Sequence, residues 1–228
     1  PQRNQRRRVH RPALTRSVGS TPSKVPSKTV RLSYSIAMAG HPHVSPILLD
    51  KAARILSAGG LIAYPTEAVY GLGCLPARQD TVERLLALKH RSWRKGLALV
   101  AADLEQLDPL VVWPKGTIRQ EILASWPGPF TWVLEAQPGT PQWLNGGRET
   151  LAVRITDHPV VRQLCERANG PLVSTSANRA GRPPLRRALH IRREFGSELD
   201  FILSGPLGGL QQPTTIRDGR TGATLRAA

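Results

Sequence analysis

Short apolar runs alternate with stretches of helical periodicity from Ser45 to the end of the chain. The apolar runs predict strands over residues 61–64, 97–100, 130–136, 151–155, 171–174 and 200–203, followed by a hairpin over 213–226 that turns at 218–220. The periodic stretches predict helices over residues 46–58, 80–89, 116–126, 158–168 and 186–195. Strands that alternate with helices are typical of α/β proteins. We therefore predict one α/β domain with a largely buried, mixed sheet flanked by helices.

Three local signals predict where helices begin. Ser45 precedes Pro46, as an N-cap residue precedes a proline at the first helical position. The segment 80–83, Asp-Thr-Val-Glu, has the pattern of a capping box, and Asp103 is expected to cap a short helix. Residues 65–74 follow the first predicted strand and are interpreted as a loop.

The formal net charge of the chain is +16, and it is unevenly distributed. Residues 1–37 contain seven Arg, two Lys and no acid, so they carry +9 and leave +7 for the rest. With almost no periodic apolar residues, residues 1–37 are predicted to be a disordered basic extension of a domain over residues 38–228. The extension resembles a transit peptide, but its prolines fit a targeting helix poorly. Because Met38 is the only methionine, we favour translation starting there.

Several classes of protein are excluded by what the sequence lacks. It has no run of about 18 apolar residues, so we expect no transmembrane helix, no membrane partner and a cytoplasmic location. Cys74 and Cys165 lie far apart and form no CxxC motif, which predicts buried, reduced thiols and no zinc site. His41 and His43 have no further ligands nearby, so we expect no protein-bound metal.

A dense basic segment, Lys-His-Arg-Ser-Trp-Arg-Lys-Gly, occupies residues 89–96. Cations at the end of a helix interact favourably with its dipole, and this explains Lys89 without a ligand. It does not explain why Arg91 and Lys95 continue the charge into the following loop, where like charges repel. A bound triphosphate would relieve that repulsion, so the segment is either a helix end or a phosphate-binding site.

Polar residues also follow or interrupt three of the predicted strands. Thr66 follows the first strand, and residues 174–178, Ser-Thr-Ser-Ala-Asn, follow another. Each is either a simple turn or part of a ligand site, because ligands of α/β proteins bind beyond the carboxyl ends of strands. Arg154 lies inside an apolar strand and needs a partner, which could be Glu67 or the carboxylate of a substrate.

Together these segments resemble the YrdC-like family, in its short bacterial form. The matching stretches, in family order, are YPTEAVYGLGC (64–74), LLALKHR and KGLALVAA (85–102), WPGPFTWVL (126–134), LAVRITDHP (151–159), PLVSTSANRAGRPP (171–184) and TIRDGRTG (215–222). The resemblance covers almost all of residues 46–226. It implies a twisted α/β sheet flanked by helices, with a wide, basic concave groove.

The resemblance also implies an activity, threonylcarbamoyl-AMP synthesis. In this reaction L-threonine, bicarbonate or CO2, and ATP give threonylcarbamoyl-AMP and pyrophosphate, for the N6-threonylcarbamoyladenosine modification at position 37 of tRNA. Mg2+ is expected to accompany the ATP. Binding to tRNA and to downstream threonylcarbamoyl-transferase proteins is expected as well.

Site residues follow by resemblance, position by position. Catalytic roles fall on the basic segment, at Lys89, Arg91 and Lys95. Threonine binding falls on Thr66, Arg154 and Ser174, with Arg154 meeting the threonine carboxylate. Nucleotide binding falls on Thr131, Ser176, Asn178 and Thr214.

Two positions depart from the family pattern. Ser92 stands where the family commonly has proline, which puts the geometry of the basic loop in question. Pro213-Thr214-Thr215 stands where the family often has a Ser-Thr pair. The alternative function is an RNA-binding module that uses a basic groove for tRNA or double-stranded RNA without catalysis. Such a module would have no use for a carboxylate-reading Arg154 beside Thr66.

Overall fold

The computed structural model describes residues 44–227. The predictions for the basic extension, for Met38 and for His41 and His43 lie outside this range.

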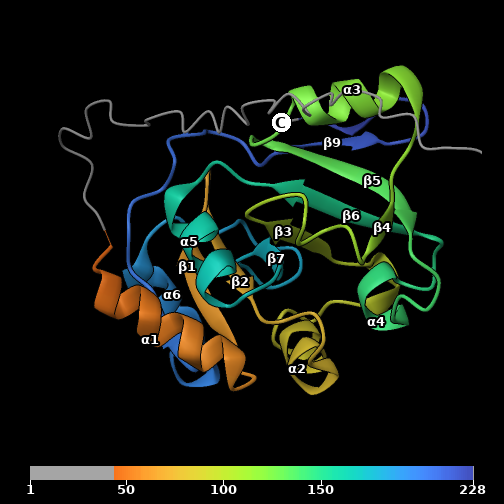
Figure 1. Cartoon of the computed structure of the whole chain (residues 1–228). Helices are drawn as coiled ribbons and strands as arrows, with labels where there is room; N and C mark the ends of the chain where they lie inside the picture. Colours follow the sequence, from red (N-terminus) through yellow and green to blue (C-terminus); the bar gives the residue numbers. More distant parts are fainter. Residues whose placement is uncertain (1–43, 228) are drawn as a thin grey trace, which may run out of the picture. The chain divides into compact units, whose positions relative to one another are not determined.

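A ten-stranded sheet forms the centre of the described chain (Figure 1). Its strand order is β10-β9-β5-β6-β3-β7-β2-β1-β8, and β4 pairs with β5 beside this path. The bounds are β1 Ile62–Pro65, β2 Tyr70–Gly73, β3 Ala98–Ala101, β4 Val111–Val112, β5 Phe130–Ala136, β6 Thr150–Ile155, β7 Leu172–Ser176, β8 Phe201–Ile202, β9 Thr215–Asp218 and β10 Thr224–Arg226.

The sheet is mixed, as predicted. The pairs β1–β8, β3–β6 and β5–β9 are parallel. The other pairs, which include β2–β7, β3–β7 and β5–β6, are antiparallel. The predicted C-terminal hairpin is also present, because β9 and β10 pair in antiparallel fashion.

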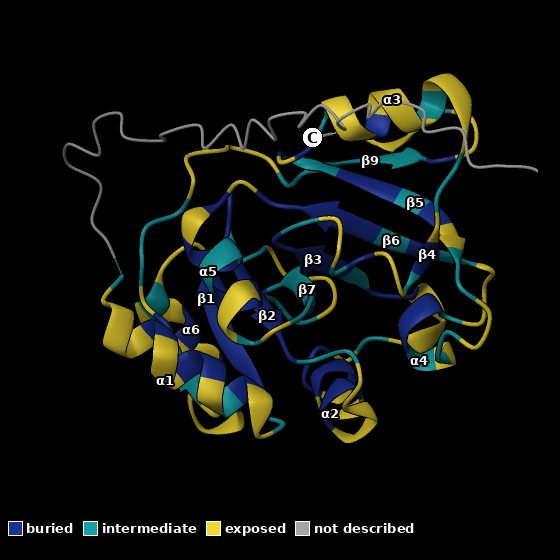
Figure 2. Cartoon of the chain, in the orientation of Figure 1, coloured by how far each residue is buried: buried dark blue, intermediate teal, exposed yellow. Residues whose placement is uncertain are grey.

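Helices cover both faces of the sheet. Their bounds are α1 Pro46–Ser57, α2 Gln79–Leu88, α3 Gly116–Ala124, α4 Gln142–Asn145, α5 Pro159–Arg167 and α6 Ala188–Phe195, with short 3-10 helices η1 Trp93–Lys95 and η2 Gly196–Glu198. Each of the helices longer than one turn buries one side and exposes the other (Figure 2).

Alternation along the strands builds two separate apolar cores. In β1, Ile62 and Tyr64 pack with α1 and α5, while Ala63 faces the other core with residues of α2 and α6. Successive side chains of a strand point to opposite faces, so an uninterrupted apolar run is what a sheet buried on both sides requires. This explains why the predicted strands lacked polar alternation.

Several predicted local features are wrong. Residues 70–73 lie in a strand, β2, although the whole segment 65–74 was expected to be a loop. Turns occupy the region after Asp103 in place of the expected helix, although Asp103 Oδ1 does accept the backbone N–H of Gln106 at 3.0 Å. Strand β4 and helix α4 were not predicted.

The predicted helix caps are also corrected. Ser45 occupies the N-cap position of α1, but its side chain makes no capping hydrogen bond. Helix α2 begins at Gln79, so Asp80 lies inside the first turn and the expected capping box is absent. Thr81 instead donates its hydroxyl to Gly59 O at 2.7 Å, which ties α2 to the turn after α1.

Residues 203–214, which we call the crossing segment, connect β8 to β9. Since β8 lies at one edge of the sheet and β9 next to the other, this segment spans the sheet. It is fixed to the turn between β1 and β2, because Gly208 N donates to Thr66 O and Leu210 N donates to Glu67 O, both at 3.0 Å. The crossing segment therefore holds the turn between β1 and β2 in place through these two backbone hydrogen bonds.

Candidate functional site

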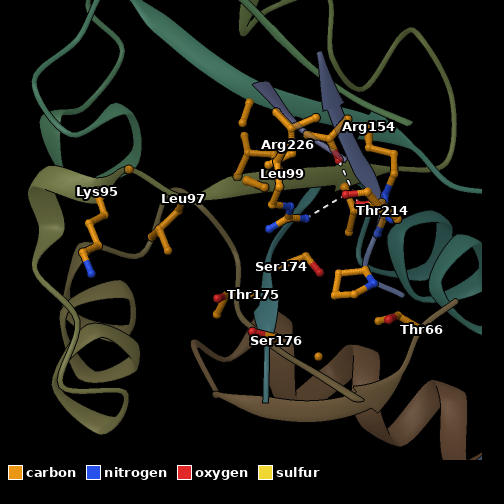
Figure 3. Close-up of a pocket in the computed structure, with 18 of the residues that line it drawn as sticks. Thr66, Lys95, Leu97, Leu99, Arg154, Ser174, Thr175, Ser176, Thr214 and Arg226 are labelled. Carbon is orange, nitrogen blue, oxygen red and sulfur yellow. Dashed lines mark hydrogen bonds between the residues drawn. The ribbon is translucent and has the colours of Figure 1, made fainter. Parts of the chain in front are cut away.

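A cavity of about 590 Å³ lies among β1–β2, β3, β5, β6, β7 and the C-terminal hairpin (Figure 3). Eight of the ten predicted site residues line it: Thr66, Arg91, Lys95, Thr131, Arg154, Ser174, Ser176 and Thr214. Lys89 and Asn178 do not line it. The fold therefore brings together residues that are scattered over most of the sequence.

The cavity is strongly cationic. Its lining contains Arg91, Lys95, Arg148, Arg154 and Arg226, and Glu67 is the single acid among the described lining residues. Cationic groups inside a concave surface focus a positive potential and raise the local concentration of anions. A polyphosphate is a ligand of matching charge.

The cations lie toward two ends. Figure 3 shows Lys95 on one side of the cavity and Arg154 and Thr214 on the other, with Arg226, Ser174, Thr175 and Ser176 between them. Lys95 is exposed at the end of η1 and lines the cavity. A ligand with two anionic groups some distance apart would satisfy both ends.

Arg91 is held at the wall of the cavity by the loop after α2. Its Nη2 donates to Gly96 O at 2.9 Å, while its buried Nε has no hydrogen-bond partner among the described residues. Burial lowers the pKa of Arg91 from its ordinary value, but a guanidinium stays charged at neutral pH. Arg91 thus keeps donors available for an anion.

The loop that carries Arg91 contains Ser92, at a position where the resemblance leads us to expect proline. Ser92 has φ −61°, which is the value that a proline ring imposes. A proline would therefore fit the backbone angle φ at this position.

Lys89 occupies a different place from the one expected of a phosphate ligand. It is 4% exposed, and its Nζ donates to Ser176 O, to Asn178 O at 2.7 Å and to Asn178 Oδ1 at 3.4 Å. Burial, and secondarily the charge of Arg91, lower its pKa to about 8. Lys89 is the C-cap residue of α2, at the helix end where the sequence placed it, but its side chain is buried. Through these hydrogen bonds Lys89 holds the end of β7 and the turn that follows it.

Asn178 belongs to the same arrangement. Its Oδ1 accepts the hydroxyl of Ser176 at 2.6 Å, and its Nδ2 donates to Arg182 O at 2.8 Å. The polar turn after β7 is therefore both a turn, as one interpretation held, and the wall of a ligand cavity. Ser176 links the two, because it lines the cavity and contacts Asn178.

Arg179 fixes this turn to the rest of the fold. Its guanidinium donates to Leu88 O at 2.8 Å, to Glu194 at 3.0 Å and to Glu198 at 2.7 Å. It thus ties the turn after β7 to the C-terminal end of α2 and to α6 and η2. The two segments that supply Arg91 and Ser176 are consequently held in one relative position.

Arg154 pairs with Glu67, one of the two partners that the sequence analysis considered. Its Nη1 lies 3.2 Å from Glu67 Oε2, and the two side chains are 9% and 5% exposed. Arg154 also lines the cavity, so the ion pair does not exclude a contact with a substrate carboxylate. A buried guanidinium with one fixed partner is preoriented for a second one.

Hydroxyl groups complete the lining. Thr66 donates its hydroxyl to Val69 O at 2.7 Å, which leaves its oxygen lone pairs to accept a hydrogen bond from a ligand. Thr131 Oγ1 on β5 lies 3.4 Å from Thr214 Oγ1, just before β9, because these strands pair in parallel.

Two lining arginines were missed by the sequence reasoning. Arg226 lies on β10 and donates to Thr214 O at 2.7 Å, and burial together with the charge of Arg154 lowers its pKa. Arg148 lies after α4 and donates to Asn145 O at 3.4 Å. The predicted hairpin could have indicated Arg226, since its second strand returns beside the segment that carries Thr214.

The described residues contain no group of three His, Cys, Asp or Glu side chains that could hold a metal ion. Cys74 and Cys165 are buried and free, as predicted, and burial raises the pKa of each thiol to about 12. Within residues 44–227, no helix is both long and apolar enough to cross a membrane.

Comparisons with known proteins identify the family of the chain. Residues 54–228 match the Sua5/YciO/YrdC family profile, described as "Telomere recombination". The chain is 52% identical over 185 residues to threonylcarbamoyl-AMP synthase of Halorhodospira halophila, covering 81% of this chain and 97% of that protein. It is 50% identical to the Pseudomonas aeruginosa threonylcarbamoyl-AMP synthase, covering 81% of this chain and all of that protein.

A solved structure provides the same fold with a ligand. P. abyssi Sua5 complexed with L-threonine has a TM-score of 0.68 and 32% identity, over 75% of this chain. The chain spans 50% of the Sua5 chain. The family profile covers more than half of the sequence, and the curated relatives are matched over nearly their whole length. The chain therefore belongs to the Sua5/YciO/YrdC family.

Proposed function

We propose that the chain is a threonylcarbamoyl-AMP synthase, which joins L-threonine, bicarbonate or CO2, and ATP. The observation that carries the proposal is the cavity itself, which is lined by five cations, the buried Arg154 among them, and by several hydroxyl groups. Two of the substrates and the pyrophosphate product are anions, and threonine carries a carboxylate. The names of the curated relatives and the threonine complex of Sua5 support the same reaction.

The two ends of the cavity suggest how the substrates are arranged. Arg154 receives the threonine carboxylate as a planar fork, beside Thr66 and Ser174. Arg91 and Lys95 receive the phosphates of ATP. Ser176, Thr131 and Thr214 contact the nucleotide, and Arg226, which donates to Thr214 O, extends this contact surface.

In the reaction the threonine amine attacks the carbon of CO2 and loses a proton, or attacks bicarbonate with loss of water, and so forms a carbamate. A carbamate oxygen then attacks the α-phosphorus of ATP and displaces pyrophosphate. No side-chain nucleophile is required. The protein positions two reactants in one cavity and neutralises the charge that develops on the leaving group. Lys89 and Asn178 contribute by fixing the turn that carries Ser176, so we assign them positioning roles.

Mg2+ is proposed to enter with the nucleotide. The single lining carboxylate, Glu67, is engaged by Thr156 and Arg154, so the described cavity does not fit a metal held mainly by protein ligands. Mg2+ commonly keeps several waters and binds substrate phosphates. When bound there, it would supply further positive charge at the phosphates.

The wider roles are part of the proposal. The product would pass to threonylcarbamoyl-transferase proteins that modify adenosine 37 of tRNA, in the cytoplasm, and direct binding of tRNA belongs to the same proposal. An RNA-binding module without catalysis is disfavoured, because it would not need a buried Arg154 paired with Glu67 at the bottom of a hydroxyl-lined cavity.

Pyrophosphate release tests the proposal. It should depend on threonine and on bicarbonate, each omitted in turn. Arg91→Ala should lower the rate about 10- to 150-fold, the range for one charge-assisted contact. Arg119→Ala, which removes an exposed arginine of α3 outside the cavity, is the matched control and should leave the rate unchanged. Pyrophosphate release at the same rate with and without threonine would overturn the proposal.

A further inference from the structure

The turn between β1 and β2 forms one wall of the cavity, since residues 66–69 all line it. Figure 3 shows Thr66 on the side of the cavity opposite Lys95. Within the turn, the backbone N–H and the hydroxyl of Thr66 both donate to Val69 O, at 3.1 and 2.7 Å. These local bonds set the shape of the turn, but its position in the cavity depends on the segments that pack against it.

The crossing segment packs against this turn through two glycines, neither of which lines the cavity. A Cβ atom on Gly205 would lie 3.1 Å from Pro65 Cγ, and one on Gly208 would lie 2.9 Å from Glu67 Cα. Gly208 N also donates to Thr66 O at 3.0 Å. At Gly208 two backbones are thus in direct contact, a close approach for which glycine is suited. A displacement of the crossing segment here would move the turn that carries Thr66.

His158 closes the space around Gly208. A Cβ atom on Gly208 would lie 3.1 Å from Cδ2 of the His158 ring, and the ring also lies beside the backbone of Pro206. His158 is 4% exposed and is the N-cap residue of α5, so a helix end fixes its position. Burial lowers the pKa of His158, and the ring is therefore neutral at neutral pH. It packs against the crossing segment as an uncharged, planar group.

A second link joins His158 to the same turn. His158 N donates to Thr156 Oγ1 at 3.1 Å, and the hydroxyl of Thr156 donates to Glu67 Oε1. The His158 side chain itself does not line the cavity, so it has no direct contact with a ligand there. Any effect of His158 on the reaction must therefore pass through the turn or through the crossing segment.

From these contacts we propose that His158 is a positioning residue for threonine, which holds Gly208 of the crossing segment against the turn that carries Thr66. The inference rests on the proposed function, since it assumes that Thr66 contacts threonine. The crossing segment reaches the proposed nucleotide subsite at Thr214, which is fixed separately, because Arg226 donates to Thr214 O at 2.7 Å. The contact between His158 and Gly208 should therefore act on threonine more than on ATP.

A role in stability alone predicts something different. If His158 and Gly208 only filled space in the fold, disturbing their contact would lower the Tm and leave the KM for threonine unchanged. A general loosening of the cavity would raise the KM for threonine and the KM for ATP alike. The discriminating quantity is therefore the KM for threonine relative to the KM for ATP.

The first experiment measures both KM values by pyrophosphate release from the full chain. Gly208→Ala places a methyl group where there is no room for it, so the crossing segment must shift against the turn. The KM for threonine should rise about 2- to 10-fold, as expected when one hydrogen bond to the substrate is lost, while the KM for ATP stays close to native. Gly170→Ala is the matched control, since no neighbouring atom of the described chain lies within 4 Å of its Cβ position, and both KM values should stay native.

A double-mutant cycle then tests whether the two residues act through their contact. His158→Ala removes the ring and should by itself raise the KM for threonine. In this background Gly208→Ala should add little, because the methyl group can occupy the space that the ring leaves. Independent effects that simply multiply, or a native KM for threonine in both single variants, would overturn the inference. If Gly208→Ala does not fold, His158→Ala decides alone, and a native KM for threonine in that variant overturns it.

The outcomes separate the two proposals. Native protein that releases pyrophosphate in a threonine-dependent way, beside variants that keep the native KM for threonine, refutes the role of His158 and leaves the proposed function standing. Native protein without threonine-dependent release refutes both.

Discussion

Replacing Lys89 by methionine should destabilise the protein as well as impair it. Methionine keeps most of the side-chain length, but it cannot donate to the acceptors around it, Ser176 O and Asn178 O foremost. Hydrogen bonds to a charged group contribute about 1.5–3 kcal/mol each. The pKa of Lys89, lowered to about 8 by burial, shows that burying the ammonium costs free energy, which offsets part of this gain.

We therefore expect a net loss of about 2 kcal/mol in the free energy of unfolding. For a chain of this size, that lowers the Tm by roughly 4–8 °C. The KM for ATP should rise more than the KM for threonine, because the turn that loosens carries Ser176. Thermal unfolding followed by circular dichroism, and steady-state kinetics in both substrates, measure these effects.

Lys95→Met is the matched control, since it makes the same substitution at an exposed lysine of the cavity. It should reduce activity while leaving the Tm within about 1 °C of native, as surface changes usually do. Our account of Lys89 would be refuted if Lys89→Met melted at the native temperature with a native KM for ATP. It would also be refuted if Lys95→Met lowered the Tm as much as Lys89→Met.

Three further predictions test other parts of the site. Arg154→Lys keeps the charge but loses the planar fork, so the KM for threonine should rise about tenfold or more while that for ATP changes little; a change in the KM for ATP alone would exclude Arg154 from the threonine subsite. The ammonium of Lys89 loses its proton as the pH rises through about 8, and a neutral amine has too few protons for its three acceptors. ATP affinity, titrated without threonine, should therefore fall above about pH 8, and constant affinity from about pH 7 to 9.5 would contradict this assignment. Ser92→Pro should raise the free energy of unfolding by about 0.4–1 kcal/mol, measured by urea denaturation, because φ at Ser92 already has the proline value; a lower stability would show that the proline ring does not fit this loop.

The architecture could be predicted because a strand that is buried on both faces of its sheet appears in the sequence as an uninterrupted apolar run. Apolar runs such as residues 61–64 and 97–100 are strands, and the periodic stretches between them are helices. Strand β2 was missed because Tyr-Gly-Leu-Gly has the composition of a loop. Pairing with β1 on one side and with β7 on the other imposes the extended form, and the local sequence of β2 does not reveal this pairing.

The candidate site was predicted in composition more than in geometry. Strand-end hydroxyls and Arg154 could be expected at the cavity, because ligands bind where strands end. The burial of Lys89 could not, since its acceptors lie 87 and 89 residues away along the chain. The pairing of Glu67 with Arg154 was one of two interpretations. Only the folded arrangement, which brings the turn between β1 and β2 next to Arg154 of β6, showed that the internal ion pair forms.

Arg226 shows a different limit of sequence reasoning. It is one of many arginines in a basic chain, and nothing in its immediate neighbourhood distinguishes it. Its place in the site depends on the pairing of β10 with β9, and of β9 with β5.

The most direct test of the central claim is the identity of the product. The full chain is incubated with ATP, Mg2+, L-threonine and bicarbonate, and the mixture is analysed by mass spectrometry, with carbon-13 bicarbonate in a parallel reaction. Our account predicts threonylcarbamoyl-AMP, heavier by one mass unit in the labelled reaction and absent when threonine is omitted. ATP that remains unconsumed, or AMP formed without a threonine-containing and bicarbonate-derived product, would contradict it.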